Sequence, residues 1–106
     1  MKSGERAPLS RAKDSGRTPS PQAAIDLAGA ALAFLADDME RLERFFALTG
    51  LDPADVRGLV GSRGFCLAVL DHVAQDERCL VLFAEASGVA PEAIGAARRA
   101  LGGGDY

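Results

Sequence analysis

The strongest constraint on the fold is an internal repetition with a period of 38 residues. The segments TGLDPADVRGLVG (49–61) and SGVAPEAIGAARR (87–99) follow one pattern, and residues 26–60 align with residues 64–98 without a gap. The positions that match in this alignment are typical of helix caps, helix ends and an apolar stripe. The sequence therefore predicts two copies of one helical unit. The identical residues are Ala30, Leu32, Ala36, Asp38, Leu42, Phe45, Gly50 and Pro53, matched by Ala68, Leu70, Ala74, Asp76, Leu80, Phe83, Gly88 and Pro91.

Each unit is expected to contain three helices. Ser20 before Pro21 is a good helix start, because serine caps the first amides and proline fits the first turn. Asp37 with Glu40 resembles a capping box for a second helix, and Gly50 is typical of a left-handed helix end. We therefore expect one compact all-α domain (21–106) made of two tandem three-helix units (26–60 and 64–98). The expected helices cover about 21–36, 38–49, 53–60, 64–74, 77–87 and 91–101.

Length and composition are those of a single globular domain. A chain of 106 residues with 48% hydrophobic residues can form a core without disulfides or metals. The sequence has neither a membrane-spanning apolar run nor the apolar centre of a signal peptide. Cys66 and Cys79 do not form a CxxC pair. We therefore expect a cytoplasmic protein with two reduced thiols.

Charge is divided unevenly along the chain. Residues 1–20 carry five basic and two acidic side chains, whereas the remainder carries seven and thirteen. Those first 20 residues are rich in Ser, Gly, Pro, Lys and Arg, so we expect a disordered basic tail. Such a tail could contact phosphates, and its candidate nucleic-acid contacts are Arg11, Lys13 and Arg17.

The turn before the third helix of each unit has the spacing of a helix-turn-helix. In DNA-binding proteins the helix after this turn enters the major groove. Here that helix begins with DPAD (52–55) or APEA (90–93), and carboxylates repel phosphates. On these third helices, only Arg98 and Arg99 are placed where they could contact phosphates. Nucleic-acid binding is therefore kept as the alternative function and is disfavoured for the helical body.

No motif predicts catalysis, a metal site or a cofactor. His72, the single histidine, aligns with Phe34 of the first unit, which indicates a partly buried packing role. The positions of Cys66 and Cys79 relative to His72 do not have the spacing of metal ligands. A phosphate loop, a nucleophile elbow and a dinucleotide fingerprint are all lacking in the sequence. We therefore expect a protein that is not an enzyme and has no cofactor.

The second helices of the two units differ most. The sequence RLER (41–44) of the first unit becomes CLVL (79–82) in the second. A helix that is apolar nearly all round is buried either between the two units or against another chain. Cys79, Val81 and Leu82 are therefore the candidate surface for a protein partner or a second copy, with internal burial as the alternative. The sequence favours a protein-protein interaction or regulatory module.

The stretch ALTGLDPADVRGLVG, followed by FCLAVLDHVAQDERCLVLFAEASGVAPEAIGAARRAL, resembles a known bacterial family. Its members are small helical proteins, found mainly in alphaproteobacteria and catalogued as a domain of unknown function (number three-five-seven-two). The likeness covers about residues 22–103, and its most specific parts are the TGLDP and DER phrases. The resemblance implies an all-helical fold and a cytosolic bacterial protein, and it implies no activity, cofactor or catalytic residue.

Overall fold

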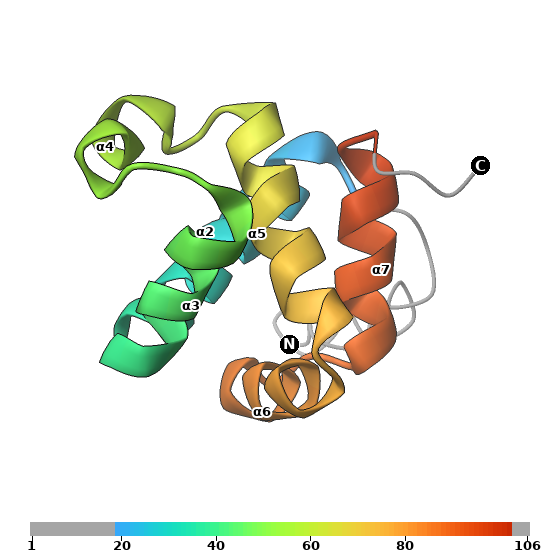
Figure 1. Cartoon of the computed structure of the whole chain (residues 1–106). Coiled ribbons are helices and arrows are strands. Elements are labelled where there is room, and N and C mark those ends of the chain that lie inside the picture. Colours follow the sequence, from blue (N-terminus) through green and yellow to red (C-terminus); the bar gives the residue numbers. More distant parts are fainter. Residues whose placement is uncertain (1–18, 103–106) are drawn as a thin grey trace, which may run out of the picture.

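The structure, a computed structural model, describes residues 19–102, and these form six α-helices without a strand. The all-α class and the six helices that the sequence predicts are confirmed. The predicted tail, with Arg11, Lys13 and Arg17, lies outside the described residues except for Pro19 and Ser20. The elements in order are α2 (Pro21–Ala36), α3 (Met39–Thr49), a 3₁₀ turn η2 (Pro53–Asp55), α4 (Val56–Leu59), α5 (Arg63–Gln75), α6 (Glu77–Ser87) and α7 (Pro91–Ala100) (Figure 1).

Side-chain caps fix where the helices begin. The Ser20 hydroxyl accepts a hydrogen bond from the Ala23 amide, as a serine N-cap does. At α3 the cap is Asp38, not the predicted Asp37, whose backbone is still helical and closes α2 instead. Asp38 has the extended backbone that an N-cap requires, and its carboxylate accepts from two amides of the first turn.

Helices α3 and α6 are matched in their bounds and in both caps. Each has 11 residues, and α6 begins 38 positions after α3. Asp76 caps α6 as Asp38 caps α3, by accepting from two amides of the first turn. Gly50 and Gly88 end the two helices at φ 75° and 73°, in the left-handed region that glycine adopts without strain.

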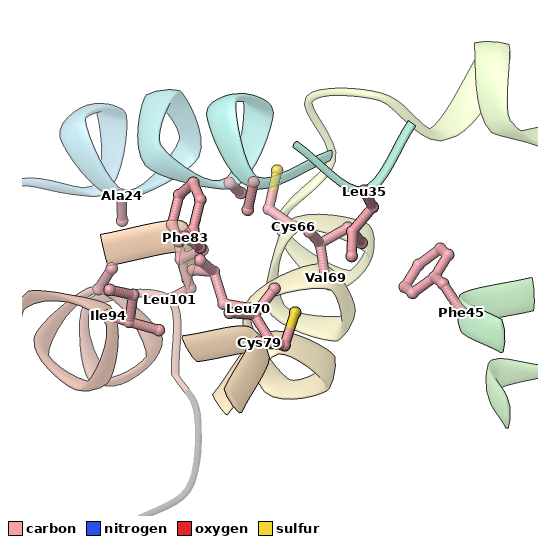
Figure 2. Packing of buried hydrophobic residues seen from close by; sticks show 14 of the residues in the cluster. Ala24, Leu35, Phe45, Cys66, Val69, Leu70, Cys79, Phe83, Ile94 and Leu101 are labelled. Atoms are coloured by element: carbon pink, nitrogen blue, oxygen red, sulfur yellow. The ribbon is translucent and has the colours of Figure 1, made fainter. Parts of the chain in front are cut away.

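The core lies where α2, α5 and α7 meet. Helix α2 packs against α5, α7 packs against both, and α3 and α6 add their apolar faces. Ala24, Leu70 and Ile94 come from these three helices and are completely buried (Figure 2). Phe45 of α3 and Phe83 of α6 complete the same cluster. The buried residues come from five helices and leave out η2 and α4.

The third helix of the first unit spans nearly the predicted residues but is not α-helical throughout. A helix was expected over 53–60, but the chain forms the short η2 and a four-residue α4, which lie at one end of the molecule (Figure 1). Gly58 weakens the helix, because glycine has a low helix propensity. Gly61 follows at φ 92°, a backbone angle that does not occur inside an α-helix. The aligned residues in α7 are Ala96 and Arg99, which favour a helix, and α7 continues to Ala100.

Two aromatic contacts join the first helix of each unit to the second helix of the other. Phe34 of α2 packs on Phe83 of α6, with ring centroids 5.5 Å apart. Phe45 of α3 packs on His72 of α5, with centroids 5.2 Å apart. A shift of 38 residues exchanges these pairs, because Phe34 aligns with His72 and Phe45 with Phe83. The duplication stays a prediction, and reciprocal contacts of this kind are what it would produce.

Candidate interaction surface and the adjoining cavity

Two of the three residues predicted as an interaction surface lie on the outside of α6. Val81 is 41% exposed and Leu82 is 38% exposed. The aligned residues on α3 are Glu43 and Arg44, which are exposed as well. The alternative of internal burial between the two units therefore does not hold for Val81 and Leu82. We call these two residues the α6 strip.

The third predicted surface residue, Cys79, belongs to the core instead. Its side chain is buried, as is that of Phe83 one turn later. Residues four apart lie on the same side of a helix, whereas Val81 is rotated by about 200° from Cys79. The prediction treated the apolar residues 79–82 as one surface, but the helical period divides them between the inside and the outside of the molecule.

Both cysteines are protonated thiols at neutral pH. Burial raises the pKa of the Cys79 thiol, and the Asp76 carboxylate raises it further. Burial also raises the pKa of Cys66, against the opposing effect of a hydrogen bond from the Gly61 backbone. A thiol held in this form is a poor nucleophile and a poor metal ligand, because both roles need the thiolate.

A polar cavity of about 390 Å³ adjoins the α6 strip. Leu82 belongs to the strip and also lines the cavity. It lies between the first turns of α3 and α6 and the last turns of α2 and α5. Arg41 and Arg44 enter it from α3, and Arg78 enters it from α6. This cavity was not predicted from the sequence. The remaining lining residues are Leu35, Asp38, Glu40, His72, Asp76 and Cys79.

One arginine of the cavity is held in place by an aromatic ring. The guanidinium carbon of Arg41 lies 4.3 Å from the centre of the Phe34 ring, within the range of a cation–π contact. Such a contact restrains the guanidinium without using its N–H donors as hydrogen bonds to a carboxylate. Among residues 19–102, Arg41, Arg44 and Arg78 form no ion pair with a carboxylate.

His72 forms part of the wall of the cavity in a neutral state. Its ring meets the Phe45 ring at an interplanar angle of 83°, as an edge-to-face contact. Burial lowers its pKa, the Asp76 carboxylate acts in the opposite direction, and Arg44 lowers it further. The partly buried packing role that the sequence predicts agrees with this position.

The candidate nucleic-acid contacts on α7 differ in availability. The Arg98 guanidinium donates from Nε to a carboxylate oxygen of Asp71 on α5, and both side chains are partly buried. Arg98 therefore ties α7 to α5, and its role as a nucleic-acid contact stays a prediction. Arg99 is exposed.

Two further properties of the described residues bear on function. Within 19–102, His, Cys, Asp and Glu side chains are not grouped in threes as a metal site would need. In the same range, a single helix with the length and hydropathy of a membrane span is not found. Helices α6 and α7 reach these values only when taken together, and they are bent by 97°.

These features define a small all-α domain with an exposed apolar strip beside an arginine-lined cavity. The chain belongs to the DUF3572 family of proteins of unknown function, whose family model matches residues 21–104. This match confirms the resemblance found in the sequence. Neither a curated protein nor a solved structure matches the chain significantly.

Proposed function

We propose that this protein is a non-catalytic interaction module that binds a protein partner, or a second copy of itself, through the α6 strip. One observation carries the proposal: Val81 and Leu82 are exposed apolar residues where the matched helix has Glu43 and Arg44. A helix face that remains in water has no packing reason to lose its charges. A face that is covered by a partner does have one.

The energetics of the strip agree with this role. Covering apolar surface contributes about 25 cal/mol per Å², so two half-exposed side chains supply only part of a binding energy. Specific interfaces bury roughly 1,200–2,000 Å² in total, with the apolar anchors near their centre. The α6 strip is therefore proposed as the centre of a larger contact that includes the polar residues around it.

The state of the titratable groups supports a non-catalytic role. Cys66 and Cys79 are the thiols of the chain, and burial raises the pKa of both. His72 packs edge-on against Phe45 and so has a structural role. Activated nucleophiles in enzymes depend on the opposite arrangement, a lowered pKa or an adjacent base.

Nucleic-acid binding, the alternative, has less support from the helical body. Arg98 is engaged by Asp71, which leaves Arg99 as the accessible candidate on α7. Any such binding would depend on residues 1–18 and would weaken steeply between low and physiological salt. Binding through the α6 strip would survive both added salt and removal of that segment.

The test compares Val81→Asp with Leu48→Asp. Leu48 is 70% exposed on α3 and lies outside the α6 strip, so it is a matched control for adding a charge. We expect both variants to keep the wild-type melting temperature within a few degrees. Only Val81→Asp should lose association in sedimentation velocity, or lose its partner in co-purification from the native cell. Equal behaviour of the two variants would refute the proposal.

A further inference from the structure

We propose that the cavity between α3 and α6 binds a small organic anion through Arg41, Arg44 and Arg78. The ligand class is a carboxylate or phosphoryl group attached to a short carbon body. This site is separate in chemistry from the α6 strip, because it is lined by guanidinium groups. The two sites share Leu82, which belongs to the strip and also lines the cavity.

The clustering of the arginines is the first argument. Residues 19–102 contain seven arginines and no lysine, and three of the seven line this one cavity. Within that range the carboxylates do not pair with these three side chains, whereas Arg98 is paired with Asp71. Arginine donates two parallel hydrogen bonds to the oxygens of a carboxylate or a phosphate. Three arginines from two helices therefore line the same cavity with donors of this kind.

Preorganisation is the second argument. The Arg41 guanidinium lies over the Phe34 ring, with its central carbon 4.3 Å from the ring centre, and this cation–π contact restrains the side chain. A side chain that is already ordered loses less conformational entropy when a ligand binds. Phe34 is in turn fixed by its contact with Phe83.

The carboxylates in the cavity do not cancel these arginines. Asp38 accepts hydrogen bonds from the amides of Glu40 and Arg41, and Asp76 accepts from those of Arg78 and Cys79. Each carboxylate thereby faces the positive end of a helix, which offsets part of its charge. The remaining carboxylate, Glu40, is exposed.

The shape of the cavity selects the rest of the ligand. Its apolar wall is formed by Leu35 and Leu82, which favours a carbon body next to the anionic group. Its volume of about 390 Å³ is near the lower end of ligand pockets, which span roughly 300–1,000 Å³. A small molecule fits these dimensions.

The experiment is an NMR titration of the full chain with phenyl phosphate in one series and benzoate in another, at constant ionic strength. We expect saturable shifts of the amides of residues 41, 44 and 78 with at least one probe, and the tighter probe identifies the anionic group. Arg44→Gln and Arg78→Gln should each weaken binding about tenfold, as loss of a charge-assisted hydrogen bond does.

The matched control is Arg57→Gln, an exposed arginine on α4 that does not line the cavity. It should bind both probes as the wild type does. Because Arg44 and Arg78 lie on different helices, misfolding of one variant leaves the other as the test. Shifts that fail to saturate with both probes would overturn the proposal. So would affinities in Arg44→Gln and Arg78→Gln that equal that of Arg57→Gln.

Discussion

Helices α3 and α6 begin and end alike but present different surfaces. Both are 11 residues long, with an aspartate N-cap, a left-handed glycine at the C-terminus and a buried phenylalanine. Around this shared frame, Arg41 of α3 corresponds to buried Cys79 of α6, and Arg44 corresponds to exposed Leu82. The comparison shows that two helices with the same caps and the same buried phenylalanine can carry different surfaces.

The third helices of the two units show the opposite outcome. The Asp-Pro and Ala-Pro starts align, yet α7 has ten residues in the core, whereas η2 and α4 remain at the periphery. Ile94 of α7 is fully buried, and the aligned Val56 is only partly buried. Here only the start of the helix is shared: α4 includes Gly58, which weakens it, and ends at Leu59, where Val60 leaves the helical conformation at ψ 129°.

The largest expected effect tests whether Phe45 and Phe83 are equivalent anchors. Each is at most 1% exposed. Replacing either by alanine should cost about 3–5 kcal/mol of the free energy of unfolding, because a large cavity remains. Urea denaturation of Phe45→Ala and Phe83→Ala measures this. A variant that keeps nearly wild-type stability would show that its ring is not an anchor.

The next comparison concerns the third helices. Ile94→Ala should cost about 2–5 kcal/mol, since Ile94 is completely buried. Val56→Ala at the aligned position should cost about 1 kcal/mol or less, because partly exposed side chains contribute less. Both values come from the same denaturation series. Equal costs would mean that η2 and α4 support the core as α7 does.

The two aspartate caps should have equal and moderate effects. Asp38→Ala and Asp76→Ala each remove a carboxylate that accepts from two amides. Each loss should cost about 1 kcal/mol, which thermal denaturation near neutral pH resolves. Asp37→Ala is the control and should have a much smaller effect, because Asp37 does not cap α3. A larger effect from Asp37→Ala would contradict the cap assignment.

The smallest effect distinguishes His72 from its counterpart Phe34. Burial is the main reason that the pKa of His72 in the folded chain lies below its ordinary value of 6.5. The unfolded chain then binds more protons between the two pKa values, so His72 costs stability as the pH falls through 6.5. His72→Phe removes this term. Lowering the pH from 7.5 to 5.5 should therefore reduce the melting temperature of the wild type more than that of His72→Phe. An equal reduction in both proteins would refute the assignment.

Local sequence signals predicted much of the fold because helix ends are local chemistry. Ser20 and Gly50 are predicted as a helix start and a helix end from their own neighbourhoods, and each lies at a helix end. Asp37 was wrongly chosen over Asp38, since two adjacent carboxylates can each cap and only the backbone angles decide between them. The helix expected over 53–60 is present over 53–59, but the sequence did not indicate that its first turn is a 3₁₀ turn.

The candidate site was predicted only in part because it depends on tertiary contacts. The unusual composition of α6 identified Val81 and Leu82, but Cys79 was assigned to the same surface without applying the helical period. Nothing local indicates that the arginines of α3 face the start of α6. In the alignment Arg41 corresponds to Cys79 and Arg44 to Leu82, which conceals their convergence on one cavity.

The central claim is that α6, and not the matched helix α3, contacts a partner. The most direct measurement places a photo-crosslinking amino acid at position 81 in one variant and at the aligned position 43 in another, in the native cell. Both positions are exposed, so neither substitution disturbs the core. We predict a discrete crosslinked species from position 81 that position 43 does not give. Equal crosslinking from both positions, or crosslinking from position 43 alone, would contradict the account.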